Sequence, residues 1–580
     1  MNQPAERLTA KTLQRFLWLL AVEGLAVFFL TFAKPSEADS AVIAGFSLQR
    51  ILLGGVTLLG CLIIILATRY FSAQNPTLDQ RMQQLNAWLA AGDRLFFTIV
   101  SFLLLTLFAG WCLLFSWLFI PANLRPQIIW LGLFSLQAAL LLGRVYRQTL
   151  CHGKFVEKYR LFPRFNSLDA GQKKVFWLLM GIAVLYVLLL MPSNLNGSDD
   201  MQAFSRYGGD EVVIYPILMD VMQPGETFSA TLYHRFIYED YHYGYPFYAW
   251  SMLVLLPVKL VYGSEFAEQI QINLPLLRVF VSVLPVVLAC IVLVFIFTRF
   301  RNGIVSAAVF LFLLFAPGTL QNNQGFWHPD GLNLLFVCLT LYFLQRDRFN
   351  YGRNFYLAAA CIGLSIATRL YGFFFVLAIG VYLLVGIARK ALSWGKAIRR
   401  GVFFVLLMAA VVVFSSPFIF RSDARANMMA IMDEKSTEMR EGYADDYDPR
   451  NDHRPGWDAW YPAFEDHYTE MFCFFFLIAS LLFGSFFGDQ RLTHWMTVCW
   501  FVVIIGYLIF FVAVKSTQYV LPALLPLMAS IFSIPLAVSS GQVPAVLRQR
   551  WARIGSWLLA WGVLLAQFVI NLIKDLPRFQ

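Results

Sequence analysis

The sequence predicts an all-α polytopic membrane protein. Of its 580 residues, 59% are hydrophobic and only 14% are charged, whereas a soluble protein carries about a quarter of charged residues. Apolar runs of about 17 to 25 residues recur along the chain, and each is long enough to cross about 30 Å of hydrocarbon. The net charge of +10 comes from basic residues in short loops between these runs. That is the positive-inside pattern, so we expect a lipid bilayer and no nucleic acid as partner.

The first part of the chain, 1–173, is expected to hold extra N-terminal transmembrane helices. Its apolar runs are 12–33, 48–68, 95–120 and 127–146. The loop that follows them is rich in Arg and Lys and therefore belongs in the cytoplasm. Counting the spans back from this loop places the N-terminus in the cytoplasm as well. We expect a multi-pass protein of a bacterial inner membrane.

The remaining chain divides into a core, a second external loop and a group of C-terminal helices. These parts are 174–420, 421–470 and 471–580, and the core contains a first external loop at 192–250. The apolar runs after this loop are 275–298, 304–320, 331–345, 355–367, 371–388, 402–420, 471–487, 495–514, 519–538 and 556–573. The prediction is therefore about 13–15 transmembrane helices and two extracytoplasmic loop regions that carry interfacial helices.

The run 246–263 is hydrophobic but is interrupted by Pro246, Pro257 and Lys259. If it crossed the membrane, the basic residues Arg299 and Arg301 would lie outside. If it lies along the interface or re-enters, they fall in the cytoplasm, as the positive-inside rule favours. We therefore expect an interfacial or re-entrant helix here.

Two adjacent carboxylates, Asp210 and Glu211, occur in the first external loop. Taken alone, such a pair is an ordinary feature of a solvated loop. The same loop continues into an aromatic run that includes His242, Tyr243 and Tyr245. Flat apolar rings pack against sugar faces while carboxylates bind hydroxyl groups. This combination favours a sugar-binding wall.

Further polar residues stand at the ends of later spans. His328 and Asp330 precede or open a span, and Asp330 equally suits a helix N-cap, where Asp is favoured. Arg369 and Lys515 lie at the predicted outer ends of spans. Each alone is explained by snorkelling to lipid headgroups. Two cations on the same face as the acids favour a bound phosphate.

The order of these features resembles the GT-C superfamily of membrane glycosyltransferases, nearest to glycosyltransferase family 39, which includes protein O-mannosyltransferases and aminoarabinose transferases of lipid A. The resemblance covers about 175 to 540. One proline of the family's Pro-Pro pair is missing, Arg replaces a Lys at one turn, and four spans precede the family's first helix. The segments that carry the resemblance are Asp210-Glu211, Tyr245-Pro246-Phe247 with Trp250, Val261-Tyr262-Gly263-Ser264-Glu265, Asp330, Thr368-Arg369 and Gln518-Tyr519-Val520-Leu521-Pro522.

The resemblance implies a GT-C fold and an enzyme that moves a sugar from a polyprenyl-phosphate donor to a hydroxyl acceptor at the extracytoplasmic face. Asp210 is then the general base of an inverting transfer, and Glu211 orients the acceptor or the base. The substrate-binding residues are expected to be His242, Tyr243, Tyr245, His328, Asp330, Arg369, Lys515 and Tyr519. No metal or other cofactor is expected.

Other functions remain open on the sequence. A transporter or flippase of lipid-linked sugars accounts for the spans and for intramembrane charges such as Glu23 and Arg278. A non-catalytic subunit of a lipid-linked glycan pathway is a third reading. The sequence specifies neither the sugar nor the acceptor.

Overall fold

The described residues form helices and contain no β-strand, which confirms the predicted all-α class. The computed structural model describes residues 10–33, 46–70, 80–82, 84–85, 95–110, 112–113, 124–151, 168–207, 209–238, 241, 243–442 and 454–575. The chain forms two compact units, Met1–Asn166 and Ser167–Gln580.

The described part of the first unit consists mainly of four apolar helices. They are α1 (Ala10–Thr31), α2 (Leu48–Tyr70), α4 (Leu95–Gly110) and α6 (Arg125–Cys151). The indole Nε1 of Trp130 in α6 donates a hydrogen bond to the carbonyl of Leu20 in α1, at 3.1 Å. Gln137 of α6 donates through Nε2 to Glu23 Oε1 at 2.5 Å. The acid in α1 is thus bound by a neighbouring amide, so α1 and α6 pack through polar as well as apolar contacts.

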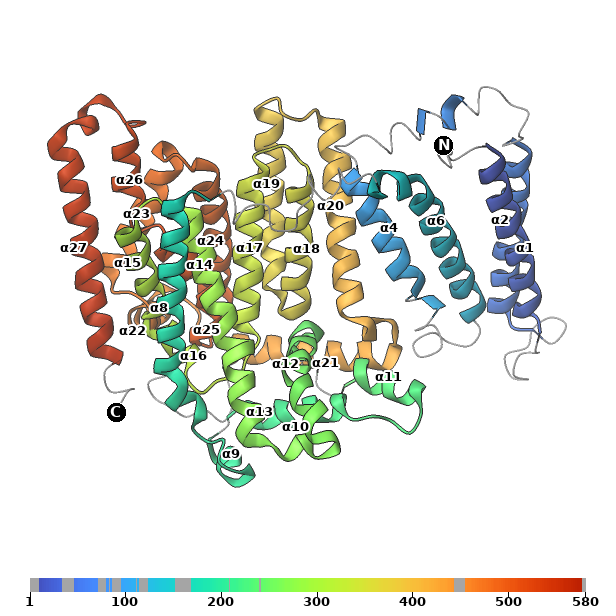
Figure 1. Ribbon diagram of the computed structural model, residues 1–580, viewed down its shortest axis with the longest axis horizontal. Coiled ribbons are helices and arrows are strands. Elements are labelled where there is room, and N and C mark those ends of the chain that lie inside the picture. Colours follow the sequence, from blue (N-terminus) through green and yellow to red (C-terminus); the bar gives the residue numbers. More distant parts are fainter. Residues whose placement is uncertain are drawn as a thin grey trace. The chain divides into compact units, whose positions relative to one another are not determined.

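Helices that run side by side in Figure 1 make up most of the second unit. They are α8 (Ala170–Leu195), α14 (Leu284–Thr298), α15 (Gly303–Leu314), α17 (Asp330–Asp347), α18 (Arg353–Thr368), α19 (Phe375–Ala388), α20 (Trp394–Ser415), α23 (Met471–Phe487), α24 (Arg491–Phe511), α25 (Thr517–Met528), α26 (Ser533–Ser540) and α27 (Arg550–Asp575). In the described part of both units, eleven helices are long and apolar enough to cross a membrane, or thirteen if two bent pairs each count as one span. The chain is therefore a polytopic membrane protein.

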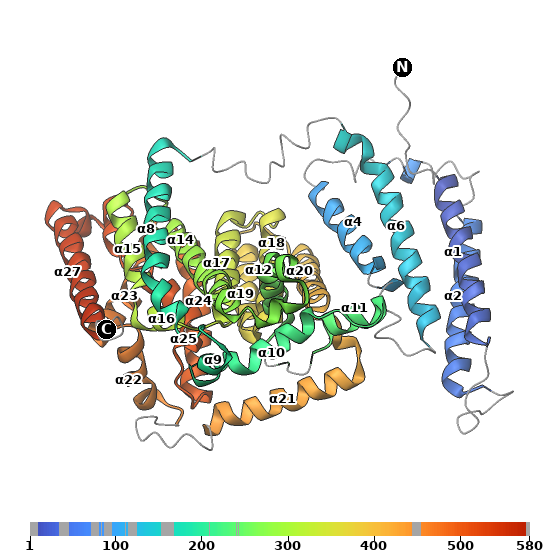
Figure 2. The same cartoon turned by 60° about the horizontal axis from the view of Figure 1, so that its bottom comes forward.

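A second group of helices gathers at one end of the second unit, the lower end in Figure 1 and the near side in Figure 2. They are α9 (Met201–Tyr207), α10 (Glu211–Met222), α11 (Phe228–Phe236), α12 (Tyr245–Tyr262), α13 (Ile270–Leu277), α16 (Pro317–Asn323), α21 (Ser422–Glu441) and α22 (Trp457–His467), with 3₁₀ segments at Gly263–Glu268, Leu370–Phe374 and Pro417–Phe420. The 3₁₀ segment Ala545–Arg548 connects α26 to α27 at the opposite end. The two predicted external loops, 192–250 and 421–470, both contribute to this end.

The stretch 246–263, which the sequence predicts to be an interfacial or re-entrant helix, forms most of α12. It is long and apolar enough to cross a membrane, and it packs beside α10, α13 and α18. Tyr215 of α10 and Leu255 of α12 belong to one buried apolar cluster that also includes Leu274 of α13. Helices α10, α12 and α13 are therefore joined by a buried apolar core of their own.

A broken helix brings one loop into this end. Helices α15 and α16 meet at an angle of 65°, and Pro317 begins α16, where its missing N–H costs no hydrogen bond. The loop 324–329 then leads into α17. A Cβ atom added to Gly331 would lie 2.5 Å from the carbonyl oxygen of Ser282. Glycine at this position thus allows the first turn of α17 to pack directly against the backbone of the helical segment that contains Ser282.

Candidate functional site

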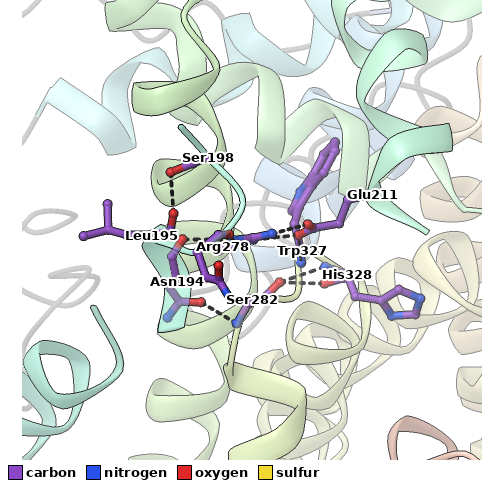
Figure 3. A network of polar contacts seen from close by, with 10 residues as sticks. Asn194, Leu195, Ser198, Glu211, Arg278, Ser282, Trp327 and His328 are labelled. Atoms are coloured by element: carbon purple, nitrogen blue, oxygen red, sulfur yellow. Dashed lines mark hydrogen bonds and ion pairs between the residues drawn. The ribbon is translucent and has the colours of Figure 1, made fainter. Parts of the chain in front are cut away.

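Glu211 is buried and forms a two-point ion pair with Arg278 (Figure 3). Arg278 Nε lies 3.0 Å from Glu211 Oε1 and Nη2 lies 2.5 Å from Oε2. The backbone N–H of Trp327 donates to the same Oε1 at 2.5 Å. Burial raises the pKa of Glu211, and the ion pair with Arg278 opposes that rise. A carboxylate bound on both oxygens in this way organises structure and has no lone pair aimed at solvent.

Arg278 reaches the end of α8 through its remaining donor group. It begins η4 (Arg278–Val283), a π-helical segment between α13 and α14. Its Nη1 donates to the carbonyls of Asn194 and Asn196 at 3.0 and 2.7 Å, at the end of α8. A buried guanidinium in an apolar run needs such partners to offset its lost hydration. Arg278 therefore ties the end of α8 to α10, and Glu211 extends this connection to Trp327 of the loop 324–329.

The next turn of the same segment holds His328 in place. Ser282 Oγ accepts a hydrogen bond from the backbone N–H of His328 at 2.8 Å and lies 3.2 Å from its carbonyl oxygen. Gly325 N–H donates to Asn194 Oδ1 at 2.9 Å, and the Trp327 indole donates to Ser251 Oγ at 3.2 Å. Three residues of the loop, Gly325, Trp327 and His328, are thus bonded to different helical segments. These bonds hold the backbone from which the His328 side chain projects.

His328, Asp330 and Arg369 form a buried polar group. His328 Nδ1 is in close contact with Asp330 Oδ2, and Arg369 Nε lies 3.3 Å from Asp330 Oδ1. Arg369 Nη2 lies 2.9 Å from His328 Nε2. Because a guanidinium only donates, Nε2 carries the lone pair and Nδ1 carries the proton directed at Asp330. Burial lowers the pKa of His328, in agreement with a neutral ring.

Aromatic rings surround this group. The Tyr243 hydroxyl lies 2.9 Å from His328 Nε2, and Phe326 stacks on the His328 ring at 4.7 Å and 15°. The Arg369 guanidinium lies over the rings of Tyr243 and Tyr519, 5.5 and 5.9 Å from their centroids. The Arg369 side chain is 16% exposed, while those of His328 and Asp330 are 1% and 0% exposed. A ligand would therefore meet this group at Arg369.

Tyr243 reaches its position because the next residue is glycine. Gly244 N–H donates to the carbonyl of Thr368 at 3.2 Å, and a Cβ atom at Gly244 would collide with the carbonyl oxygen of Ala367. The chain thus crosses the end of α18 in backbone contact, immediately before Arg369. This crossing sets Tyr243 beside Arg369.

Asp210 differs from its neighbour Glu211. It stands at the N-cap of α10 without making a capping hydrogen bond, and its side chain is exposed. Among the described residues, no group forms a hydrogen bond or an ion pair with its carboxylate. Its charge nevertheless acts on His328, Tyr243 and Glu211. Asp210 is thus an accessible carboxylate beside the buried polar group.

Five of the predicted substrate-binding residues lie together: Tyr243, His328, Asp330, Arg369 and Tyr519. Tyr245 points elsewhere and packs against Phe236 and Tyr238. Lys515 Nζ donates to the carbonyl of Arg454 at 2.5 Å. His242 lies outside the described residues.

The sequence had not assigned Arg278, Ser282 or Trp327 to the site. A signal for Arg278 was present, because a charge in the middle of an apolar run requires a buried partner. Ser282 and Trp327 act through backbone contacts and stacking, and no residue pattern marks such roles.

Chemically, the arrangement offers an exposed carboxylate, a largely buried cation and aromatic walls. In the described ranges there is no group of three or more His, Cys, Asp or Glu side chains placed to hold a metal ion. Comparisons of the chain with protein-family models, with curated proteins and with solved structures found no match.

Proposed function

We propose that the chain is an integral-membrane glycosyltransferase that moves a sugar from a polyprenyl-phosphate donor to a hydroxyl acceptor at the extracytoplasmic face. One observation carries the proposal: Asp210 is exposed and unpaired among the described residues, and it lies within electrostatic reach of the group around Arg369. The residues proposed as base for the acceptor and as cation for the departing phosphate, Asp210 and Arg369, thus lie at the same end of the helix bundle.

In the proposed step, the acceptor oxygen attacks the anomeric carbon of the donor sugar. The bond between this carbon and the phosphate oxygen breaks, and its electron pair leaves with the polyprenyl phosphate. The acceptor proton passes to the Asp210 carboxylate, which acts as general base. Attack opposite the leaving group inverts the anomeric configuration, as in inverting glycosidases.

Arg369 is the proposed partner of the donor phosphate. Its guanidinium is held by Asp330 and by the lone pair of His328, so its orientation is fixed before a ligand arrives. A cation held in place stabilises the charge that grows on a leaving phosphate without reorganisation during the reaction. The rings of Tyr243 and Tyr519 stand beside it and suit the apolar face of a sugar.

Glu211 takes a positioning role in this proposal. Its ion pair with Arg278 fixes the first turn of α10, and Asp210 is the residue that precedes this turn. Glu211 therefore orients the base, which is one of the two roles that the sequence left for it. Lys515 would hold the phosphate only after releasing the carbonyl of Arg454.

Transfer from labelled polyprenyl-phosphate sugars tests the proposal. Membranes that contain the chain are given a panel of such donors with a mixture of hydroxyl acceptors, and membranes without the chain serve as control. The proposal predicts a labelled glycoside of inverted anomeric configuration, formed only with the chain. Movement of the intact lipid-linked sugar across the bilayer with no new glycosidic bond would instead support the transporter alternative.

A further inference from the structure

A groove of about 620 Å³ opens between α10, α11 and α12, on residues that the proposed transfer does not use. One side is an apolar stripe along α12 that consists of Ala249, Met252, Leu253, Leu256 and Leu260. The stripe leaves large apolar groups uncovered, since Leu253 is 59% exposed and Leu260 is 77% exposed. Their spacing of three or four residues places them on one face of the helix.

Two cations stand at the same groove. Arg235 of α11 and Lys259 of α12 both line it. Arg235 Nη2 lies 3.2 Å from the carbonyl oxygen of Met222, and Lys259 Nζ contacts the same oxygen. Met222 is the last residue of α10, so its carbonyl carries the partial negative charge of a helix C-terminus. Two full positive charges thus converge on one partial negative charge.

No acid compensates these charges in the described part of the chain, where the ion pairs include neither Arg235 nor Lys259. Like charges held close together repel each other unless an anion binds. A phosphate group matches this need, because Arg and Lys both donate to phosphate oxygens. The neighbouring apolar stripe would remain uncovered if a free inorganic anion bound.

We propose that this groove binds an acidic phospholipid of the bilayer. Arg235 and Lys259 hold its phosphate, and one acyl chain lies along the apolar stripe of α12. Such a lipid joins the helices on either side of the segment that carries Tyr243, since α11 ends before this segment and α12 begins directly after Gly244. The bound lipid therefore stabilises the end of the molecule that holds the candidate site. The proposal does not depend on the transfer reaction.

Lipid binding to the purified full chain in detergent tests the proposal. Phosphatidylglycerol is titrated against phosphatidylcholine, and bound lipid is counted by native mass spectrometry while unfolding is followed by heating. Wild type is expected to retain phosphatidylglycerol in preference and to unfold at a higher temperature with it. Each basic residue near an acidic lipid contributes to its binding, so the double variant Arg235→Gln/Lys259→Gln should bind phosphatidylglycerol about thirtyfold more weakly.

A matched control is the double variant Lys396→Gln/Arg399→Gln, which removes the same charge from exposed positions of α20. This control should keep the preference for phosphatidylglycerol. Inorganic phosphate at the same concentration should not reproduce the stabilisation. If it does, or if the Arg235→Gln/Lys259→Gln variant keeps the preference, the lipid site is wrong. Should that variant fail to fold, Leu253→Gln leaves both cations in place and should still weaken lipid binding, and unchanged binding would equally reject the site.

Discussion

Glu211 and Arg278 are 67 positions apart in the chain, yet Arg278 Nη2 lies 2.5 Å from Glu211 Oε2 and both side chains are buried. Because of this ion pair, the adjacent acids Asp210 and Glu211 have different surroundings. Glu211 is bonded on both oxygens and faces the protein, whereas Asp210 is exposed and makes no capping bond. The proposed chemistry therefore depends on Asp210, and the local structure depends on Glu211.

Glu211→Gln is expected to destabilise the protein strongly. Removing one partner leaves the Arg278 charge buried without its counter-ion, which costs about 3–5 kcal/mol. Thermal unfolding of the purified protein in detergent measures the loss. The double variant Glu211→Met/Arg278→Met removes both charges and should recover part of the stability. Equal unfolding temperatures for the single and double variants would contradict the account of the ion pair.

Acidification is expected to destabilise the folded chain through His328. Its ordinary pKa is 6.5, and burial, helped by the nearby charge of Arg369, lowers the pKa in the folded state, while the carboxylates of Asp330 and Asp210 oppose this shift without cancelling it. As pH falls below 6.5, the unfolded chain binds a proton at this residue and the folded chain does not, so unfolding becomes more favourable. The loss ends once pH falls below the folded pKa, and above 6.5 the residue has no effect.

The measurement is the unfolding temperature between pH 7.5 and pH 5, for wild type and for His328→Gln. The variant cannot take up a proton at this position, so its curve should depend less on pH. His234→Gln is the control, because the side chain of His234 is 44% exposed. If the unfolding temperature of His234→Gln depends on pH as weakly as that of His328→Gln, then His328 is not the cause of the acid destabilisation.

Gly244→Ala is expected to displace Tyr243 from Arg369. The new methyl group collides with the carbonyl oxygen of Ala367, and forcing such a contact costs about 1–3 kcal/mol. Both the unfolding temperature and sugar transfer should therefore fall. Gly395→Ala is the matched control, since no atom lies within 4 Å of its added Cβ and alanine favours the helix there. Full transfer activity of Gly244→Ala would contradict the claim that the backbone contact at Gly244 places Tyr243 beside Arg369.

Arg369→Lys is expected to weaken donor binding although it keeps the positive charge. The guanidinium contacts Asp330 through Nε and His328 through Nη2, and a single ammonium group cannot reproduce both contacts. Loss of charge-assisted hydrogen bonds should raise the KM for the donor by about tenfold or more. Initial rates over a range of donor concentrations measure this. An unchanged KM would show that the donor phosphate binds elsewhere.

Much of the fold follows from local sequence. Apolar runs long enough to cross a bilayer predict helices because backbone groups in lipid must bond within their own segment. The course of the run 246–263 could not be predicted in the same way. Its interruption by proline suggested a broken helix, yet Pro257 lies inside α12 without ending it. Composition alone does not say whether neighbouring helices compensate for such a proline.

The site was predictable in its residue types and less so in its pairing. Asp210 and Glu211 are adjacent and chemically similar, and the sequence gives no reason to bury one and expose the other. The structure separates them because α10 begins at Glu211 and successive helical residues point about 100° apart. The partner of Glu211 is equally remote in sequence. Long-range pairing of this kind depends on how helices pack, which no local pattern encodes.

The central claim, that Asp210 is the base of a sugar transfer, is tested most directly with Asp210→Asn. Donor retention and transfer from labelled polyprenyl-phosphate sugars are measured together in membranes that contain wild type, Asp210→Asn or Asp199→Asn, a control at an exposed acid of the same loop. The account predicts that Asp210→Asn retains donor while transfer falls by about a hundredfold to ten-thousandfold, and that Asp199→Asn transfers like wild type. Equal transfer by Asp210→Asn and wild type would contradict it.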